Sequence, residues 1–229
     1  MKIRIKFKKE GVMKFIGHLD VMRYFQKLLR RASIPIAYSS GMSPHQIMSF
    51  AMPLGTGIES DAEYVDIEIT DYISSEAAIR AMNNNNVEGI EIVSFKELPE
   101  NAKNAMASIY AAKYYVTFRD KYKPDFKLDE ALLKLMNKDT IEIIKKTKKG
   151  ETAVDIKPGI YEYSCDKDSL TVTLATGSAL NIKPEYVIEA LLKEYGLIYT
   201  DNSLLIRRLE IYTNINDSLV SLDDIGHCI

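Results

Sequence analysis

Residues 17–38 read GHLDVMRYFQKLLRRASIPIAY. Apolar residues recur there every three or four positions, which is the spacing of one face of a helix. Asp20 falls in the first turn, and Arg30 and Arg31 fall in the last, where each charge is favourable to the helix dipole. Proline interrupts a helix, so Pro35 is expected to follow its end. The stretch therefore predicts one amphipathic helix followed directly by a short strand.

Alternating apolar and polar residues on both sides of this helix predict strands. Residues 2–8 alternate apolar with basic side chains, which predicts a half-buried strand with a basic outer face. Residues 64–69 and 90–95 also read as strands, and Ser74 or Ser75 can cap the helix between them. The predicted order is strand, helix, strand, strand, helix, strand.

The same order is expected a second time after a linker near residue 100. Its predicted elements are strand 111–118, a helix from residue 128, strands 152–156 and 170–174, helix 185–194 and strand 203–212. Two successive β-α-β-β-α-β units predict an α+β protein with two tandem ferredoxin-like domains and antiparallel sheets. The predicted boundaries are 1–100 for the N-terminal domain, 107–216 for the C-terminal domain and 217–229 for a tail.

Composition limits the class of partner. The formal net charge is −2, yet residues 1–31 hold ten basic residues against two acids. A nearly neutral chain can carry a basic face, and a partner meets that face rather than the average charge. No stretch reaches the roughly 18 apolar residues of a membrane span, and Cys165 and Cys228 are too few for a disulfide framework. A cytoplasmic protein without a membrane partner is expected.

The basic residues of the helix are the first candidate site. Arg23, Lys27, Arg30 and Arg31 recur at helical spacing on the face opposite the apolar one. Such a row can follow a phosphate backbone and release its counterions. Lysines of the first strand and of residues 145–149 are expected to add to this nucleic-acid-binding surface.

The loop after the helix is the second candidate, and we name it the ligand loop. It is rich in glycine, serine and proline, and its candidate contact residues are Tyr38, Ser39, Gly41, His45 and Phe50. Readers of single-stranded RNA use aromatic side chains to stack bases, and the two aromatic residues fit that role.

His18 is the one candidate for catalysis. A helix N-terminus disfavours an imidazolium, so a neutral His18 could act as general acid or base on a phosphodiester, or it could simply cap the helix. For a metal, His18 and His45 would need Asp20 or Glu63 beside them. No His-x-x-x-His or Cys-x-x-Cys spacing supports this, so no metal site is predicted.

A longer signature covers residues 11–64. Its parts are Gly17-His18-Leu19-Asp20, Arg30-Arg31-Ala32, Pro35 with Ala37-Tyr38-Ser39, Gly41 with Pro44-His45, Ser49-Phe50-Ala51, Pro53-Leu54, and Ser60 with Glu63-Tyr64. Weaker matches are Asp155-Ile156-Lys157-Pro158, Lys183-Pro184-Glu185 and Arg207-Arg208. This pattern resembles the radical SAM-linked proteins of unknown function, which occur free-standing or as the C-terminal part of cobalamin-binding radical SAM proteins. Met42-Ser43 departs from the Phe-Asn pair that is usual in the family.

The resemblance implies a radical SAM protein as partner, cobalamin-dependent in some cases. This chain lacks the Cys-x-x-x-Cys-x-x-Cys set, so the iron–sulfur cluster and S-adenosylmethionine are expected only in the partner and no cofactor is expected here. Some relatives lie near genes for ribosomes and RNA processing, which implies RNA as a further partner. A fold-level likeness also links the expected architecture to the CRISPR repeat RNA endonucleases, which have a histidine near their first helix.

Three functions remain open at this point. The leading expectation is a radical SAM-associated accessory module, itself not an enzyme, that binds RNA or presents substrate for RNA modification. The first alternative is a metal-independent ribonuclease with His18 as its acid or base. The second is a protein-interaction domain that docks only to the radical SAM partner.

Overall fold

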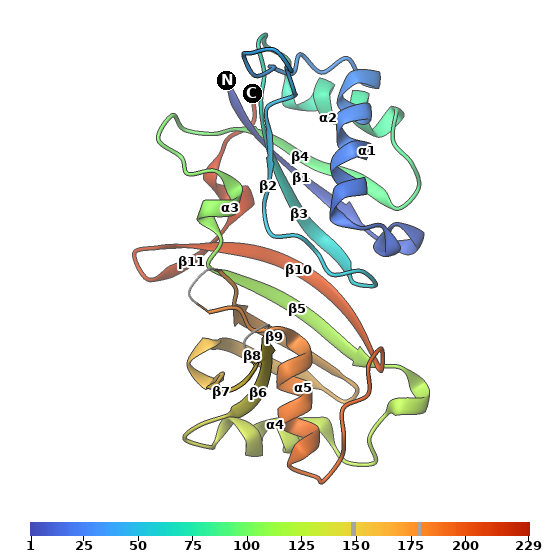
Figure 1. The fold of residues 1–229 in the computed structure, drawn as a ribbon, viewed down its shortest axis with the longest axis vertical. Helices are drawn as coiled ribbons and strands as arrows, with labels where there is room; N and C mark the ends of the chain where they lie inside the picture. Colours follow the sequence, from blue (N-terminus) through green and yellow to red (C-terminus); the bar gives the residue numbers. More distant parts are fainter. Residues whose placement is uncertain (148–149, 178–179) are drawn as a thin grey trace. The chain divides into compact units, whose positions relative to one another are not determined.

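A computed structural model describes residues 1–147, 150–177 and 180–229 (Figure 1). The chain forms two compact units. Unit 1 comprises Met1–Tyr110 and Arg208–Ile229, and unit 2 comprises Ala111–Arg207. Residues 208–229 thus group with the N-terminal part of the chain, whereas the sequence suggested a C-terminal domain to residue 216 and a separate tail.

Unit 1 combines antiparallel strands with helices. Its elements are β1 (Lys2–Lys9), η1 (Gly11–Phe15), α1 (His18–Arg31), β2 (Met48–Phe50), β3 (Glu59–Glu68), α2 (Ser75–Asn84), β4 (Ile90–Glu97), α3 (Ala105–Ser108), the end of β10 (Leu204–Ile215), β11 (Ser218–Ser221) and η4 (Leu222–Ile225). Strand β1 lies between β4 and β3, β2 pairs with the far edge of β3, and all these pairs are antiparallel. Helices α1 and α2 cover one face of this sheet.

The core of unit 1 follows from the two periodicities in the sequence. Ile3, Ile5 and Phe7 alternate along β1 and are at most 1% exposed. They pack with the buried side of α1, including Phe25 and Leu28. Burial of each large apolar side chain contributes on the order of 2 kcal/mol, and this packing holds α1 on the sheet.

The other side of β1 is not the exposed basic face that the sequence suggested. Arg4 is 1% exposed, and its Nε and Nη2 donate to the two carboxylate oxygens of Asp66 at 2.8 and 2.9 Å. Lys6 pairs with Glu210 at 2.7 Å, and Lys8 pairs with a glutamate of β4. That prediction was wrong, because acids from other elements neutralise these cations.

The predicted helix is confirmed, but the strand expected after it is wrong. Ser33 takes a φ of +53° just beyond α1, the left-handed conformation that commonly ends a helix. Past Pro35 the chain makes only isolated bridges at Ile36 and Tyr38. The next helix is confirmed too, since the Ser74 hydroxyl accepts a hydrogen bond in its first turn.

Unit 2 is also a mixture of helices and antiparallel strands. Its elements are β5 (Ala111–Phe118), η2 (Asp120–Tyr122), α4 (Leu128–Met136), β6 (Glu142–Thr147), β7 (Gly150–Asp155), η3 (Lys157–Gly159), β8 (Ile160–Asp166), β9 (Ser169–Ala175), α5 (Pro184–Lys193) and the start of β10. Strand β9 lies between β5 and β8, while β6 and β7 form a separate hairpin.

The hairpin changes the expected order of unit 2. The strand predicted at 152–156 falls in β7, which pairs with β6, so it is not a neighbour of β9. That neighbour is β8, which the sequence prediction missed. Part of the basic turn predicted at residues 145–149 lies outside the described residues.

The last residues of the chain are structured. Asn216 and Asp217 have φ values of +51° and +59° and form the tight turn between β10 and β11. At the terminus, the Ile229 backbone N–H donates to the Ser75 hydroxyl at 2.9 Å. Residues 217–229 therefore add a strand and a cap to unit 1.

The fold is thus a mixed α+β fold with mostly antiparallel strands and few helices. Within the residues that the structure describes, no helix has the length and apolar character to cross a membrane.

Candidate nucleic-acid interface and an adjoining hollow

The structure brings the four predicted basic residues together on one face of α1. Arg23, Lys27, Arg30 and Arg31 are all exposed. The opposite face of α1 is buried in the core of unit 1. The helical period that creates the core face thus creates the basic face as well.

Local contacts orient three of these cations, and only one of the three is paired with an acidic side chain in the described structure. Arg23 pairs with Asp20 at 3.2 Å, the only acidic partner among the contacts of this face in the described structure. Arg30 Nε donates to a backbone carbonyl within α1 at 3.1 Å. Arg31 donates to the Asn85 carbonyl at 3.1 Å, and its guanidinium lies 5.9 Å from the centre of the Tyr24 ring. Because carbonyls carry no formal charge, Arg30 and Arg31 remain available to a phosphate.

Three of the five candidate residues of the ligand loop lie in one turn, and Tyr38 directly precedes it. The Ser39 hydroxyl is 2.9 Å from His45 Nδ1 and accepts from the His45 backbone N–H at 3.1 Å. Gly41, between them in sequence, has a φ of +114°, which L-residues rarely adopt. Tyr38 precedes this turn and is 50% exposed, so its ring can be reached by a ligand.

A buried glutamine joins this turn to α1. Gln46 is 5% exposed, and its Nε2 donates to the Gln26 carbonyl at 3.2 Å. The same Nε2 lies 3.4 Å from the Tyr38 hydroxyl. Arg30 Nε donates to the same Gln26 carbonyl, so the ligand loop and the basic face meet at one backbone oxygen.

Phe50 does not lie with the rest of the ligand loop. It is 8% exposed, and its ring packs edge-on against Phe25 at 5.5 Å, His18 at 5.6 Å and Phe7 at 6.3 Å between centroids. The core covers its faces, which leaves no surface on which a base could stack.

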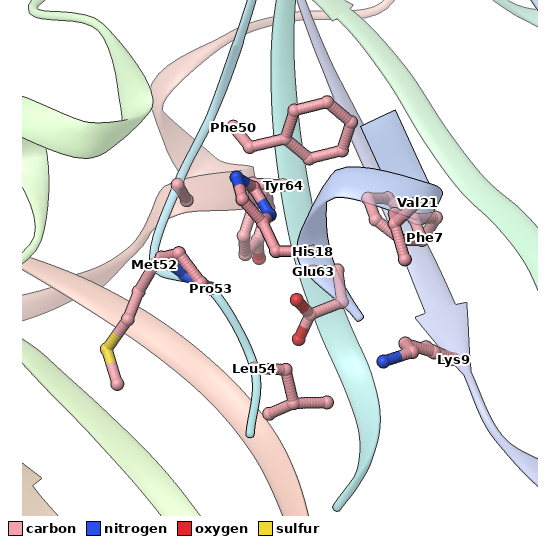
Figure 2. A pocket seen from close by; sticks show the side chains of 11 residues that line it. Phe7, Lys9, His18, Val21, Phe50, Met52, Pro53, Leu54, Glu63 and Tyr64 are labelled. Carbon is pink, nitrogen blue, oxygen red and sulfur yellow. The ribbon is translucent and has the colours of Figure 1, made fainter. Parts of the chain in front are cut away.

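His18 opens α1 and borders a small hollow (Figure 2). Lys9 and Glu63 point into the same space from β1 and β3. Its other lining residues are Phe7, Val21, Phe50, Ala51, Met52, Pro53, Leu54 and Tyr64. The space admits on the order of one water molecule.

Lys9 is the residue of this hollow that the sequence analysis missed. It is 3% exposed, and its Nζ donates to the Ile16 carbonyl at 2.8 Å. Burial lowers the pKa of its ammonium, the nearby Glu63 carboxylate partly opposes that effect, and Arg208 adds to it. The signal was present, because Lys9 follows Phe7 in the alternation that points inward along β1.

Glu63 has a separate partner. Its carboxylate accepts a hydrogen bond from the guanidinium of Arg208, which is fully buried on β10. Next to it, the Tyr64 hydroxyl donates to Glu210 at 2.5 Å, and burial raises the pKa of this phenol far above its usual range. These side chains fix the wall of the hollow on the β3 side.

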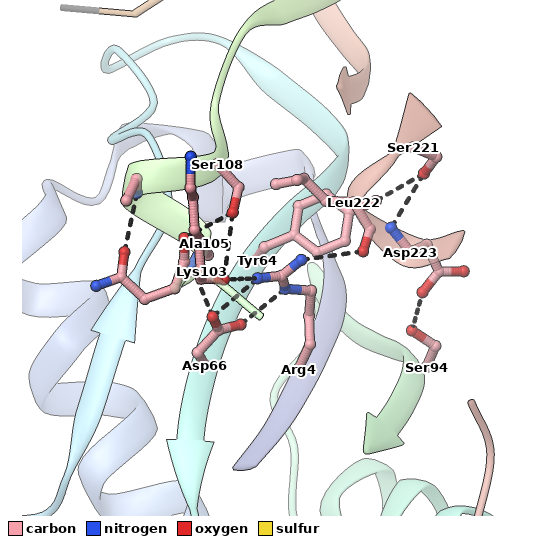
Figure 3. A network of polar contacts seen from close by, with 12 residues as sticks. Arg4, Tyr64, Asp66, Ser94, Lys103, Ala105, Ser108, Ser221, Leu222 and Asp223 are labelled. Atoms are coloured by element: carbon pink, nitrogen blue, oxygen red, sulfur yellow. Dashed lines mark hydrogen bonds and ion pairs between the residues drawn. The ribbon is translucent and has the colours of Figure 1, made fainter. Parts of the chain in front are cut away.

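A second polar network covers the opposite face of the unit 1 sheet (Figure 3). Arg4, held by Asp66, also donates to the carbonyls of Lys103 and Leu222 at 3.3 Å each. The Ala105 backbone N–H donates to Asp66 at 2.6 Å. These hydrogen bonds hold the segments around α3 and η4 against the sheet. This face is therefore covered, and nucleic-acid bases cannot stack on it.

The described residues contain no group of three or more His, Cys, Asp or Glu side chains placed to hold a metal ion. His18 and His45 have different neighbours, Phe50 and Ser39 respectively. Cys165 and Cys228 are free thiols.

A family model described as an uncharacterized protein conserved in bacteria (DUF2344) matches residues 2–184, which is more than half of the chain. The matched range includes α1, the ligand loop and the β1 and β3 walls of the hollow. A comparison with curated proteins finds no match.

Proposed function

The chain belongs to the DUF2344 family of uncharacterized bacterial proteins, and we propose that it is an accessory module that binds RNA and presents it to a radical SAM modification enzyme. The observation that carries this proposal is the exposed row Arg23, Lys27, Arg30 and Arg31 on α1. The proposal includes a cytoplasmic location, where such an enzyme would meet its RNA.

The basic face suits a phosphate backbone for a physical reason. Successive exposed cations on one helix can each neutralise a phosphate and release a condensed counterion. Tyr38, joined to Arg30 through Gln46 and the Gln26 carbonyl, adds an accessible ring beside these cations. Proteins that bind single-stranded nucleic acids commonly combine a row of cations, which contact the phosphates, with aromatic rings on which bases stack.

The proposed architecture is two tandem ferredoxin-like domains. In unit 1, β4, β1, β3 and β2 follow one another across the sheet, and α1 and α2 connect strands as a β-α-β-β-α-β unit requires. In unit 2, the hairpin of β6 and β7 would be an insertion into the same plan.

The partner half of the proposal rests on the resemblance of residues 11–64 to radical SAM-linked proteins. The partner, cobalamin-dependent in some cases, would supply the iron–sulfur cluster and S-adenosylmethionine. This chain would bind the substrate and would not be an enzyme by itself.

The proposal is tested by whether the purified protein retains cellular RNA at low salt. Wild-type protein should carry RNA that moderate salt releases. The double charge reversal Lys27→Glu and Arg30→Glu should lose it, while the matched double reversal Lys2→Glu and Lys103→Glu, at exposed positions elsewhere in unit 1, should keep it. Equal retention by all three proteins would remove the physical basis of the proposal.

The ribonuclease alternative gains one observation from the structure, since His18 shares its hollow with the buried amine of Lys9. A histidine and a lysine can serve as base and phosphate ligand in metal-free RNA cleavage. Cleavage of an RNA pool in excess chelator, abolished by His18→Ala in a folded protein, would favour this alternative. Intact RNA would leave the accessory module as the better account.

A module that docks only to the radical SAM protein is the remaining alternative. It predicts partner binding that salt does not weaken, together with protein that purifies free of RNA. That pair of results would make the basic face a docking or solvated surface.

A further inference from the structure

The hollow in Figure 2 contains a buried cation that the proposed RNA interface does not use. Lys9 follows Ile3, Ile5 and Phe7 at the inward-facing positions of β1, where a charge is costly. Its ammonium has three N–H donors, and in the described structure one of them is used, in the hydrogen bond to the Ile16 carbonyl. Lys9 lines the hollow together with His18 and Glu63.

The carboxylate across the hollow does not pair with Lys9. Glu63 accepts from Arg208, and within the described residues no carboxylate lies within 4.0 Å of Lys9 Nζ. A buried ammonium without an ion-pair partner is stabilised by any anion that can reach it, because apolar surroundings screen their attraction poorly.

Other features of the hollow suit an anion. His18 offers an imidazole from α1, and Gly17 gives the N-terminus of this helix no side-chain cap, so the positive end of the dipole lies close by. Met52 and Leu54 supply apolar walls, and the exposed Pro53 lies at the rim, on the loop that connects β2 to β3.

We propose that this hollow is a binding site for a small oxyanion, a carboxylate or phosphate group, held by Lys9 Nζ and the His18 imidazole. The narrow space, of about one water molecule, has room for one oxygen of such a group and leaves the rest of the ligand at the rim beside Pro53. The site is separate from the basic face of α1, and its occupant need not be RNA.

The competing account is structural, in which Lys9 only tethers Ile16 and the hollow holds water. The two accounts differ in their response to added anions. A tether is indifferent to phosphate or acetate, whereas an oxyanion site responds with saturation.

The histidine imidazoles provide the readout, since the chain has three of them, His18, His45 and His227. The intact protein is titrated with sodium phosphate, and separately with sodium acetate, against sodium chloride at equal ionic strength. Imidazole signals are followed by NMR. A saturable shift of the His18 signal, with His227 unmoved, is expected with at least one probe. Saturation by phosphate alone would identify the group as phosphoryl, and saturation by acetate alone as carboxylate.

Variants connect the shift to Lys9. Lys9→Met should weaken the binding of the active probe by about tenfold or more, the loss expected for a charge-assisted hydrogen bond. Lys8→Met, one residue away and paired on the surface, should leave it unchanged. If Lys9→Met does not fold, His18→Gln, followed by the thermal shift that the probe produces, gives the same test.

The inference fails if neither probe gives a saturable shift of His18, or if folded Lys9→Met binds as well as wild type. If the protein binds phosphate here but retains no RNA, the oxyanion site is supported and the proposed RNA-binding function is refuted. If it retains RNA but binds neither probe, the RNA-binding function is supported and the oxyanion site is refuted.

Discussion

Replacement of Lys27 and Arg30 by alanine should weaken the binding of single-stranded RNA in a way that can be calculated from the structure. These two are chosen because neither forms an ion pair in the described structure, whereas Arg23 pairs with Asp20 and Arg31 holds the end of α2. Their removal therefore deletes free positive charge without deleting a salt bridge.

The size of the effect follows from counterion release. Each phosphate contact to a single strand adds about 0.7 to the slope of log K against log salt concentration, so two lost contacts lower the slope by about 1.4. Taken from a reference near 1 M salt, this corresponds to a loss of about 25-fold in affinity at about 0.1 M salt.

The assay is fluorescence anisotropy of a labelled single strand of about ten nucleotides, titrated with protein at several salt concentrations. The matched control is Lys2→Ala with Lys103→Ala, which removes the same charge from exposed positions elsewhere in unit 1 that form no ion pair in the described structure. Melting curves establish that both variants fold. An unchanged slope in the α1 variant, or an equal loss in the control, would refute the assignment of the phosphates to this face.

Three further predictions concern other parts of the molecule. Asp66→Ala should cost about 3–5 kcal/mol in urea unfolding because it leaves Arg4 buried without its partner, and a loss below about 1 kcal/mol would contradict the buried pair. Iodoacetamide at neutral pH should modify Cys165 more slowly than the exposed Cys228, because burial raises the pKa of the Cys165 thiol to about 11 and leaves little thiolate. Its rate should rise with pH until that value is passed, and equal rates for the two thiols would speak against the burial. Tyr38→Ala should weaken single-stranded RNA binding by about 1–3 kcal/mol while Tyr38→Phe leaves it almost unchanged, and equal losses would rule out stacking.

The sequence predicts best where local pattern and packing agree. The 3.6-residue period of α1 fixes both its buried face and its exposed cations, so the helix and its basic row are both found from the sequence. The cap at Ser74 is local in the same sense, since the hydroxyl serves the first turn of its own helix.

Two of the failures involve residues far apart in sequence. Arg4 was expected in solvent, but Asp66 on a distant strand pairs with it. Phe50 was expected to meet a ligand, but three rings from other elements cover it. Lys9 lay outside the strand predicted at residues 2–8 and was missed, although its phase along β1 directs it inward. Composition and spacing do not show which distant residue will meet a given side chain.

Irregular and inserted elements were also missed. Residues 152–156 were expected to pair with the strand at 170–174, but β8 pairs with that strand instead. The backbone groups of β7 are hydrogen-bonded to β6 in a separate hairpin. The turn at Asn216 and Asp217 contains two residue types that tolerate positive φ, and that signal could have predicted the hairpin of β10 and β11.

Ultraviolet cross-linking of the purified protein to single-stranded RNA, with the modified peptides identified by mass spectrometry, tests the central claim most directly. The account predicts cross-links on the exposed side of α1 and in the turn from Tyr38 to His45, reduced together by Lys27→Glu with Arg30→Glu. Cross-links confined to other elements, or none at concentrations that saturate known single-strand binders, would contradict it.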